Sequence, residues 1–274
     1  MIVKAEETKK VELLLEGWQE TLIWSCLQNM MGEIYADSLE TPASAMAHLG
    51  DFCFLAGKPN RELVLYRPER CRQDFIIMVP QNELWAEEIE RCYGGRAKRV
   101  MRYAFQKEKG IFDRNKLQNA VRSLPPEYSL KMIDENCYHL CREQSWSADL
   151  VSQYPDYGTY ERLGIGAVIL KDGEVVSGAS SYSRYRDGIE IEIDTKEAYR
   201  RKGLAYICAS KLILECLERN LYPSWDAQNQ WSVALAEKLG YHYDHAYPAY
   251  EVRDWGKQKA WVSFTNGIRY DAGQ

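Results

Sequence analysis

Ile189-Glu-Ile-Glu-Ile-Asp-Thr195, followed by Arg200-Arg-Lys-Gly-Leu-Ala205, is the stretch that decides the fold of this chain. Its first part alternates apolar and acidic residues, which is the period of a β-strand. Its second part is a short basic turn, and apolar residues at helical spacing continue from Leu204 to about Asn220. The sequence therefore predicts a strand that runs through a basic turn into an amphipathic helix.

The basic turn is predicted to bind a pyrophosphate. Backbone N–H groups at a helix N-terminus have no partner within the helix, and the helix dipole favours an anion beside them. Gly203 has no side chain to block close approach, and Arg200, Arg201 and Lys202 add positive charge. Such short glycine motifs have many false positives, and a solvated basic connection is the alternative. The segments on either side favour the phosphate site.

Strands are predicted before the turn, and helices and strands after it. Asp172-Gly173 joins two apolar runs, which is a strong signal for a β-hairpin, and a second turn at Asp187-Gly188 leads into the acidic strand. Downstream, the pattern predicts a short strand at Leu221–Ala227 and a helix over Asn229–Tyr241 that ends at Gly240. Two further apolar runs follow, at Tyr241–Val252 and Ala260–Phe264.

This order resembles the GNAT superfamily of acyl-CoA-dependent N-acyltransferases, from about Tyr128 to the C-terminus. The motifs that carry the resemblance are Arg200-x-x-Gly203-x-Ala205, Asn229-x-x-Ser232 and Leu239-Gly240-Tyr241. More loosely, the whole chain resembles the bacterial GNAT subfamily that includes the zwittermicin A self-resistance acetyltransferase, in which a different N-terminal half precedes the acyltransferase half.

The resemblance implies a fold and an activity. The fold would be α/β, with a mixed, mostly antiparallel sheet flanked by helices. The activity would be transfer of an acetyl group from acetyl-CoA to a primary amine of a small molecule, by direct attack in a ternary complex. An amino-containing antibiotic or metabolite would be the acceptor.

The resemblance also implies the cofactor-binding residues. Backbone groups of Ile193 and Thr195 would bond the pantetheine amides. Asn229 would reach the pantetheine arm or the phosphate region, with Ser232 one turn further along its helix. The turn that would wrap the CoA pyrophosphate consists of Arg200, Arg201, Lys202, Gly203, Leu204 and Ala205.

Glu190 and Glu192 are the candidates for the catalytic base. The acceptor amine is mostly protonated at neutral pH, so a base must remove a proton before attack. The two glutamates alternate onto one face of the strand that should hold the thioester, and burial of a carboxylate raises its pKa towards the working range. A solvated sheet face is the alternative for both, and the sequence does not rank them.

One group expected from the resemblance is absent. In much of the superfamily a Tyr that protonates the departing thiolate follows the Asn by seven residues, and here that position is Ala236. Tyr241, Tyr243 and Tyr247 lie near in sequence, although a Tyr in a strand is more often a packing residue. The gap leaves open a non-catalytic, CoA-binding regulatory module as the alternative function.

The composition is that of a globular protein long enough for two modest domains, with 274 residues, 46% of them hydrophobic and 27% charged. A formal net charge of −5 gives no sign of a nucleic-acid partner. It also speaks against the third alternative, an aminoacyl or peptidyl transferase that would use charged tRNA. The start lacks an apolar signal core and no apolar stretch would span a bilayer, so we expect a cytoplasmic protein without a membrane partner. The sequence does not show the oligomeric state.

Two domains are predicted, with a boundary at Ser123-Leu-Pro-Pro126, because Pro-Pro interrupts both helix and strand. Residues 1–124 would form a smaller α/β domain, and residues 125–274 the GNAT acetyltransferase domain. The N-terminal domain could be a degenerate acyltransferase-like half, but it has no motif for CoA.

Cysteines and aromatic residues offer two further hypotheses. Cys137 and Cys141 share a helical face, but no second Cys/His pair completes four ligands, so no metal site is predicted. The eight cysteines are expected to be buried thiols. Four aromatic residues would either line an acceptor pocket or, as the better interpretation for any one of them, pack against the sheet: Trp146, Tyr154, Tyr157 and Tyr160.

Overall fold

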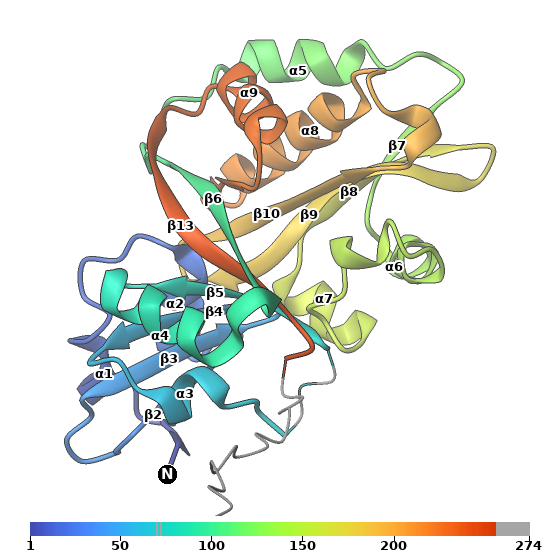
Figure 1. Cartoon of the computed structure of the whole chain (residues 1–274). Helices are drawn as coiled ribbons and strands as arrows, with labels where there is room; N and C mark the ends of the chain where they lie inside the picture. Colours follow the sequence, from blue (N-terminus) through green and yellow to red (C-terminus); the bar gives the residue numbers. More distant parts are fainter. Residues whose placement is uncertain (70, 72, 256–274) are drawn as a thin grey trace, which may run out of the picture.

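The computed structural model describes residues 1–69, 71 and 73–255, which form two β-sheets with helices on both faces of each (Figure 1). The first sheet has the order β1 (Val3–Lys4), β2 (Glu33–Ala36), β3 (Ser44–Leu49), β4 (Phe52–Gly57), β5 (Phe75–Pro80), β13 (Tyr243–Arg253), β6 (Ala97–Phe105) and β12 (Asp226–Ala227). The second has the order β11 (Tyr222–Ser224), β10 (Gly188–Thr195), β9 (Glu174–Tyr185), β8 (Gly166–Lys171) and β7 (Ser129–Met132).

Neighbouring strands pair antiparallel, apart from β4 with β5 and β10 with β11. This is the mixed, mostly antiparallel α/β architecture that the sequence predicts. The helices are α1 (Lys9–Glu12), α2 (Thr21–Leu27), α3 (Arg61–Leu65), α4 (Glu83–Tyr93), α5 (Arg114–Arg122), α6 (Glu135–Glu143), α7 (Tyr157–Leu163), α8 (Leu204–Glu218) and α9 (Gln230–Leu239). Short 3-10 turns occur at Gly94–Arg96, Ala148–Leu150 and Glu197–Tyr199.

The period of two along each strand divides the first sheet between two cores. Ala45 and Ala47 of β3 pack with Ile23 of α2, whereas Met46 points to the other face. There it packs in the same core as Trp85 of α4. Both faces of a central strand such as β3 are therefore used in packing, which explains the apolar run Ala45-Met46-Ala47.

The second sheet is divided in the same way. Ile189 of β10 packs beneath α8, in the same core as Leu212 of that helix and Leu117 of α5. On the opposite face, Val168 of β8 packs with Tyr138 of α6. Figure 1 shows α8 and α5 above this sheet and α6 and α7 below it.

The elements predicted around the basic turn are confirmed, except that the single strand predicted over Leu221–Ala227 is two short strands, β11 and β12, in different sheets. Asp172 and Gly173 have φ values of +52° and +84°, as a tight hairpin turn between β8 and β9 requires. Helix α9 begins after Asn229, and it ends at Gly240 with a φ of +114°. The predicted run Ala260–Phe264 lies outside the described residues.

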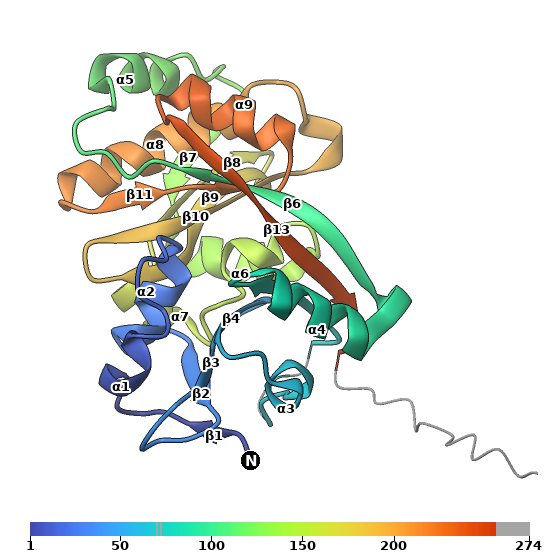
Figure 2. The same ribbon diagram turned by 60° about the vertical axis from the view of Figure 1, so that its left-hand side comes forward.

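Strands β6 and β13 connect the two halves of the molecule. They lie side by side from the helices over the second sheet to α4 (Figure 2). The first sheet thus takes strands from both sides of residue 124, and Phe105 packs in the core beneath α8. Side chains from before and after Ser123–Pro126 pack in the same hydrophobic core. A domain boundary at this point therefore stays a prediction.

All eight cysteines are free thiols, and six of them are buried. Burial raises the pKa of Cys137 to about 11 and that of Cys141 to about 12, so neither favours the thiolate that a metal would need. In the described ranges, no three His, Cys, Asp or Glu side chains are placed to hold a metal ion. The described helices also include none long and apolar enough to cross a membrane.

Candidate active site

The neighbouring strands β10 and β11 separate halfway along their length. They pair in parallel only where Gly188–Glu190 lies opposite Tyr222–Ser224. The chain then leaves the second sheet, and Asp226 and Ala227 pair with β6 of the first. On its other side β10 stays paired with β9 as far as Thr195. Residues 191–195 of β10 are therefore open along one edge.

The backbone of β10 presents hydrogen-bonding groups at this open edge. Lys196, just past the strand, donates its N–H to the carbonyl of Val176 at 3.0 Å. Because bonded pairs alternate along an antiparallel ladder, the backbone groups of Ile193 and Thr195 point away from β9. The N–H of Thr195 bonds the carboxylate of Asp194 at 2.6 Å. An extended ligand with amide groups fits the edge as an added strand would.

The N-terminus of α8 lies at the end of the same strand. Gly203 precedes this 15-residue helix with a φ of +81°, and no side chain among the described residues caps its first turn. A Cβ atom at Gly203 would meet no other heavy atom within 4 Å. The uncapped N–H groups and the helix dipole therefore face open space, which is the arrangement that binds an anion.

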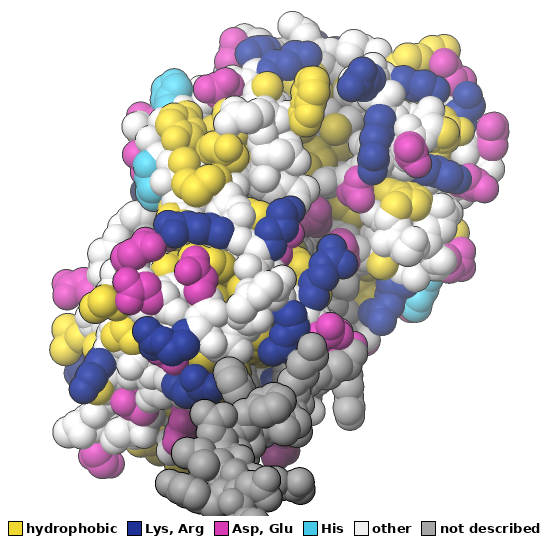
Figure 3. Space-filling model, viewed as in Figure 1, with side chains coloured by type: hydrophobic (Ala, Val, Ile, Leu, Met, Phe, Trp, Pro, Cys, Tyr) yellow, Lys and Arg dark blue, Asp and Glu magenta, His cyan; other side chains and the backbone are white. Residues whose placement is uncertain are grey.

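A cleft of about 710 Å³, here called the outer cleft, connects these features. One side is formed by β10, the turn before α8 and helix α9, and the other by β5, β6 and β13. Figure 3 shows Lys and Arg side chains gathered across the middle of the molecule, between the two sheets. Of the residues predicted to bind the cofactor, five line the outer cleft: Ile193, Thr195, Arg200, Ala205 and Ser232.

The three basic residues of the turn are held in different ways. Arg200 donates Nε to a carbonyl at the end of β10, at 3.1 Å. The guanidinium of Arg201 lies 5.6 Å from the ring centre of Trp231 on α9. The ammonium of Lys202 lies 4.8 Å from the ring of Tyr199. Trp231 also lines the outer cleft, so Arg201 borders it through this contact.

Leu204 and Asn229 have structural contacts. Leu204 is buried in the core beneath α8. The side-chain oxygen of Asn229 accepts the backbone N–H of Ser232 at 3.0 Å and so caps α9. The Ser232 hydroxyl accepts the indole N–H of Trp225 at 3.1 Å. Neither Leu204 nor Asn229 lines the outer cleft, and their predicted contacts with a cofactor stay predictions.

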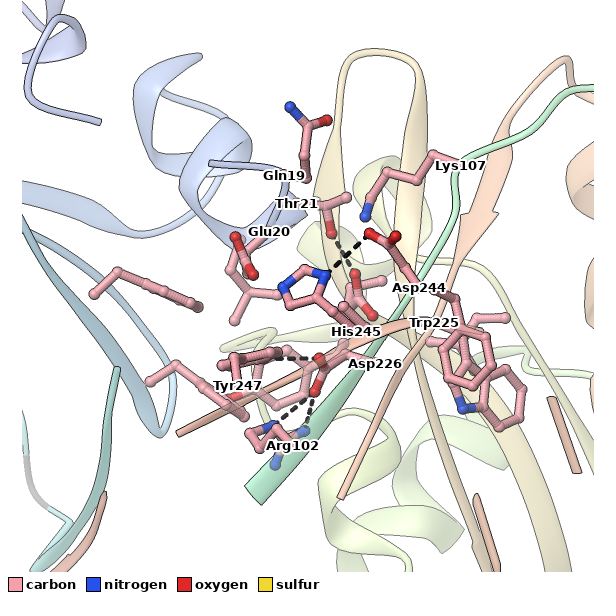
Figure 4. A pocket seen from close by; sticks show the side chains of 18 of the residues that line it. Gln19, Glu20, Thr21, Arg102, Lys107, Trp225, Asp226, Asp244, His245 and Tyr247 are labelled. Atoms are coloured by element: carbon pink, nitrogen blue, oxygen red, sulfur yellow. Dashed lines mark hydrogen bonds and ion pairs between the residues drawn. The ribbon is translucent and has the colours of Figure 1, made fainter. Parts of the chain in front are cut away.

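The outer cleft adjoins a smaller cavity of about 80 Å³, here called the inner chamber (Figure 4). Its walls come from the start of α2, from β4, β6 and β13, and from β10. Residues that line both cavities mark the junction between them, and include Arg102, Tyr182, Ile191, Glu192, Trp225 and Asp226. Glu190 lines the inner chamber but not the outer cleft.

Asp226 joins three strands at the junction. The Nε of Arg102 donates to Oδ1 of Asp226 at 2.6 Å, and the hydroxyl of Tyr247 donates to Oδ2 at 2.7 Å (Figure 4). These residues belong to β12, β6 and β13 respectively. Both carboxylate oxygens of Asp226 are therefore satisfied, and the network fixes this wall of the site.

Glu190 is a buried acid. Its side chain accepts a hydrogen bond from the hydroxyl of Thr21 through one oxygen, while the other oxygen, Oε1, is buried without a partner in the described part of the chain. Only 7% of the residue is exposed, so it does not lie on the solvated sheet face that was the alternative. Burial and the charge of Asp226 raise the pKa of Glu190 to about 7.

Glu192 lies at the junction and is partly buried. Burial raises its pKa to about 8, with a further contribution from the carboxylates of Asp149 and Asp194. A carboxyl group with a pKa near the working pH is suited to take up and release a proton. The alternating strand thus places both predicted bases in one connected site.

Replacing Glu190 by Gln should stabilise the protein in alkaline solution. The pKa of Glu190 is raised from 4.5 to about 7 on folding, so the folded state holds the proton more tightly and its stability falls as pH rises through this range. The Gln amide oxygen can still accept from Thr21. We expect the free energy of unfolding of the variant to exceed that of the wild type by on the order of 2 kcal/mol at pH 8.5, with no such gain at pH 4.

Urea unfolding of the two proteins at both pH values measures this difference. A gain of the same size at both values would mean that the stabilisation is not linked to the proton of Glu190.

Ala236 occupies the position at which the resemblance leads us to expect a Tyr, and it is fully buried in the core beneath α8. Tyr241 is also buried, and its hydroxyl donates to the Pro223 carbonyl at 2.6 Å. Tyr247 lines the inner chamber, as does Tyr182, whose hydroxyl accepts the backbone N–H of Asp51 at 2.9 Å. Among the described residues, Tyr182 and Tyr247 are thus the tyrosines that line the inner chamber.

The four aromatic residues considered for an acceptor pocket line neither cavity. Tyr154 and Tyr160 are buried, and their hydroxyls bond Ser181 and Ser180 at 2.7 and 2.9 Å. They pack in the core beneath the second sheet, with Trp146 and Tyr157 at its margin. The packing interpretation of these residues is the one the structure supports.

Sequence reasoning missed the part of the site that comes from the N-terminal half. Glu20, Thr21, Arg102 and Lys107 all line the inner chamber. None of them lies in a motif. The pairing of β6 with β12 and β13 brings Arg102 and Lys107 to the site, and the packing of α2 against β9 and β10 brings Glu20 and Thr21. Asp226 was inside a predicted strand, but its role depends on Arg102, which is 124 residues away in the chain.

Comparison with known proteins agrees with this geometry. A sequence model described as GNAT acetyltransferase matches residues 12–250. The uncharacterised N-acetyltransferase YdfB of Bacillus subtilis (strain 168) is 28% identical over 241 residues, which cover 84% of this chain and 89% of that protein.

Solved structures also resemble the chain. The GCN5-related N-acetyltransferase-like protein from Streptococcus suis 89/1591 is 49% identical, with a TM-score of 0.85 over 90% of this chain and 99% of that one. A tandem GNAT protein from the clavulanic acid biosynthesis pathway has a TM-score of 0.51 at 10% identity, covering 93% of this chain and 98% of that one. The latter similarity shows a shared fold alone.

Proposed function

Because the chain belongs to the GNAT acetyltransferase family and is an acyltransferase, we propose that it transfers an acetyl group from acetyl-CoA to a primary amine of a small molecule. The observation that carries the proposal is that one connected site holds an open strand edge, an uncapped helix N-terminus, the buried carboxyl group of Glu190 and the partly buried one of Glu192. An amino-containing antibiotic or metabolite is the acceptor on the strength of the zwittermicin A resemblance alone, and the cytoplasm is the proposed place of action.

The residues of the outer cleft fit acetyl-CoA. The N–H groups at the start of α8 would bind the diphosphate, with Arg200, Arg201 and Lys202 neutralising its charge. The open edge of β10 at Ile193 would bond the pantetheine amides. The other residues on this side come from α8 and α9, and they are Ala205, Trp231, Ser232 and Leu235.

Glu192 is proposed as the base, because it lies where the outer cleft meets the inner chamber. Its carboxylate takes a proton from the acceptor ammonium, directly or through water, and the freed amine attacks the thioester carbonyl. A backbone N–H of β10 or of the turn polarises that carbonyl. The C–N bond forms, the C–S bond breaks and CoA leaves as a thiolate. The nitrogen loses its second proton, which the thiolate takes up directly or through water, and Glu192 releases the first proton to solvent.

Direct attack without a covalent acyl-enzyme is supported by the cysteines. None of the eight lines the outer cleft or the inner chamber. Burial raises the pKa of several of them, such as Cys208, to about 12, which disfavours the nucleophilic thiolate.

Release of CoA thiol in the presence of a broad panel of amines tests the proposed function. We expect thiol release only when an amine is present, together with a product heavier by one acetyl group in mass spectrometry. Calorimetric titration with CoA accompanies the screen. CoA binding without thiol release from any amine would support the non-catalytic, CoA-binding alternative and contradict the proposal.

A further inference from the structure

More carboxyl groups than cationic side chains line the described part of the inner chamber. Among the described residues, five carboxyl groups line it, those of Glu20, Glu190, Glu192, Asp226 and Asp244. Arg102 is bonded to Asp226, and His245 to Asp244 at 3.0 Å. Lys107 is thus the one remaining cation for the three glutamates in the described lining.

Two of these glutamates have oxygens without partners. Oε2 of Glu20 and Oε1 of Glu190 are buried, and neither has a hydrogen bond within the described part of the chain. Glu190 is more than nine-tenths buried. The ammonium of Lys107 lies 5.7 Å from the ring centre of Trp24, and no ion pair joins it to either glutamate in the residues described. Leaving such groups buried and unpaired is costly, so their retention points to a ligand that pairs with them.

Much of the remaining wall of the chamber is aromatic. Phe52, Phe54, Phe105, Trp225 and the ring of Tyr247 line it. A volume of about 80 Å³ gives room for several water-sized groups. Aromatic walls with unpaired carboxylates suit a short methylene chain that ends in a cation.

We propose that the acceptor is a small diamine, whose second ammonium group binds in the inner chamber beside Glu20 and Glu190 while the amine to be acetylated lies at the junction beside Glu192. This inference rests on the proposed function, and it names the acceptor class. The bound ammonium pairs with the two buried carboxyl oxygens, Oε2 of Glu20 and Oε1 of Glu190, that lack a partner among the described residues. A neutral group of the same length leaves their oxygens unpaired.

Matched pairs of amines test the charge requirement directly. The diamines are 1,3-diaminopropane, 1,4-diaminobutane and 1,5-diaminopentane. Their partners are 3-amino-1-propanol, 4-amino-1-butanol and 5-amino-1-pentanol, which keep the length and a polar end but lack the second charge. With acetyl-CoA saturating, we expect kcat/KM for the best diamine to exceed that for its amino alcohol by about tenfold to 100-fold, the effect of one charged hydrogen-bonded contact in a buried site.

The variants Glu20→Gln and Glu190→Gln locate the effect. Each should lower the diamine-to-amino-alcohol ratio of kcat/KM by about tenfold, whatever happens to the absolute rates. Glu87→Gln, at an exposed position of α4, is the control and should keep the wild-type ratio. Circular dichroism confirms that each variant is folded.

The outcomes separate this inference from the proposed function. A wild-type ratio near one, or a ratio that survives both substitutions, overturns the diamine inference while acetylation of amines stands. If no amine releases thiol, the proposed function fails. Calorimetric titration of the CoA-bound protein then decides the inference: tight binding of a diamine over its amino alcohol supports it, and equal binding contradicts it.

Discussion

Replacing Gly203 by Glu is expected to weaken CoA binding by about 100-fold or more, the loss of a charged contact together with added repulsion. A side chain at this position enters the open space before the N-terminus of α8, where we place the diphosphate. The Glu carboxylate would occupy that space with a competing negative charge. Isothermal titration calorimetry with CoA measures the change.

Gly173→Glu is the matched control for this variant. Gly173 has a φ of +84° against +81° for Gly203, and a Cβ atom at either position meets no other heavy atom within 4 Å. The backbone strain of about 1 to 2 kcal/mol from a left-handed, non-glycine residue is therefore common to both variants. Gly173 lies in the hairpin turn between β8 and β9 and does not line the outer cleft, so its variant should bind CoA normally. Wild-type affinity of Gly203→Glu would place the diphosphate elsewhere.

The parts of the fold that depend on local interactions were predictable from the sequence. The hairpin at Asp172-Gly173, the start of α8 after Gly203 and the end of α9 at Gly240 each depend on residues within a few positions. Turn chemistry and helix capping act over that range, so sequence patterns report them directly. The alternation in β10 likewise places Glu190 and Glu192 near one another.

Long-range pairing was not predictable in the same way. The chain leaves β11 at Ser224 and joins the other sheet at Asp226, and this step both opens the edge of β10 and builds the junction. Thr21 bonds Glu190 across 169 residues of sequence. A strand pattern identifies which residues share a face, but it does not show whether solvent or another sheet covers that face.

Glu190 illustrates this limit. The alternation of β10 is compatible with a solvated acidic face, and the register shift between Glu190 and Ile191 is not visible in the sequence. Only the packing of α2 and β6 over the strand buries the side chain and raises its pKa. The half of the chain that carries no recognisable motif thus supplies the burial that shifts the pKa of Glu190.

Replacing Glu192 by Gln should lower kcat by about 10²-fold to 10⁴-fold, the usual contribution of a positioned general base. The Gln side chain has nearly the same shape, so it should leave CoA binding close to that of the wild type. Rates of thiol release at saturating acetyl-CoA and amine measure the change. Glu197→Gln, at an exposed position after β10, is the control and should keep the wild-type rate.

The pH dependence of this loss distinguishes a base from a residue that only shapes the site. The pKa of Glu192 is raised to about 8, so at lower pH the carboxyl group is increasingly protonated and unable to accept a proton. The ratio of wild-type to variant kcat/KM should therefore rise with pH up to about 8 and then become constant. Titration of the acceptor amine affects both proteins equally and cancels in the ratio. A ratio that does not change with pH would show that the carboxyl group of Glu192 does not take the proton.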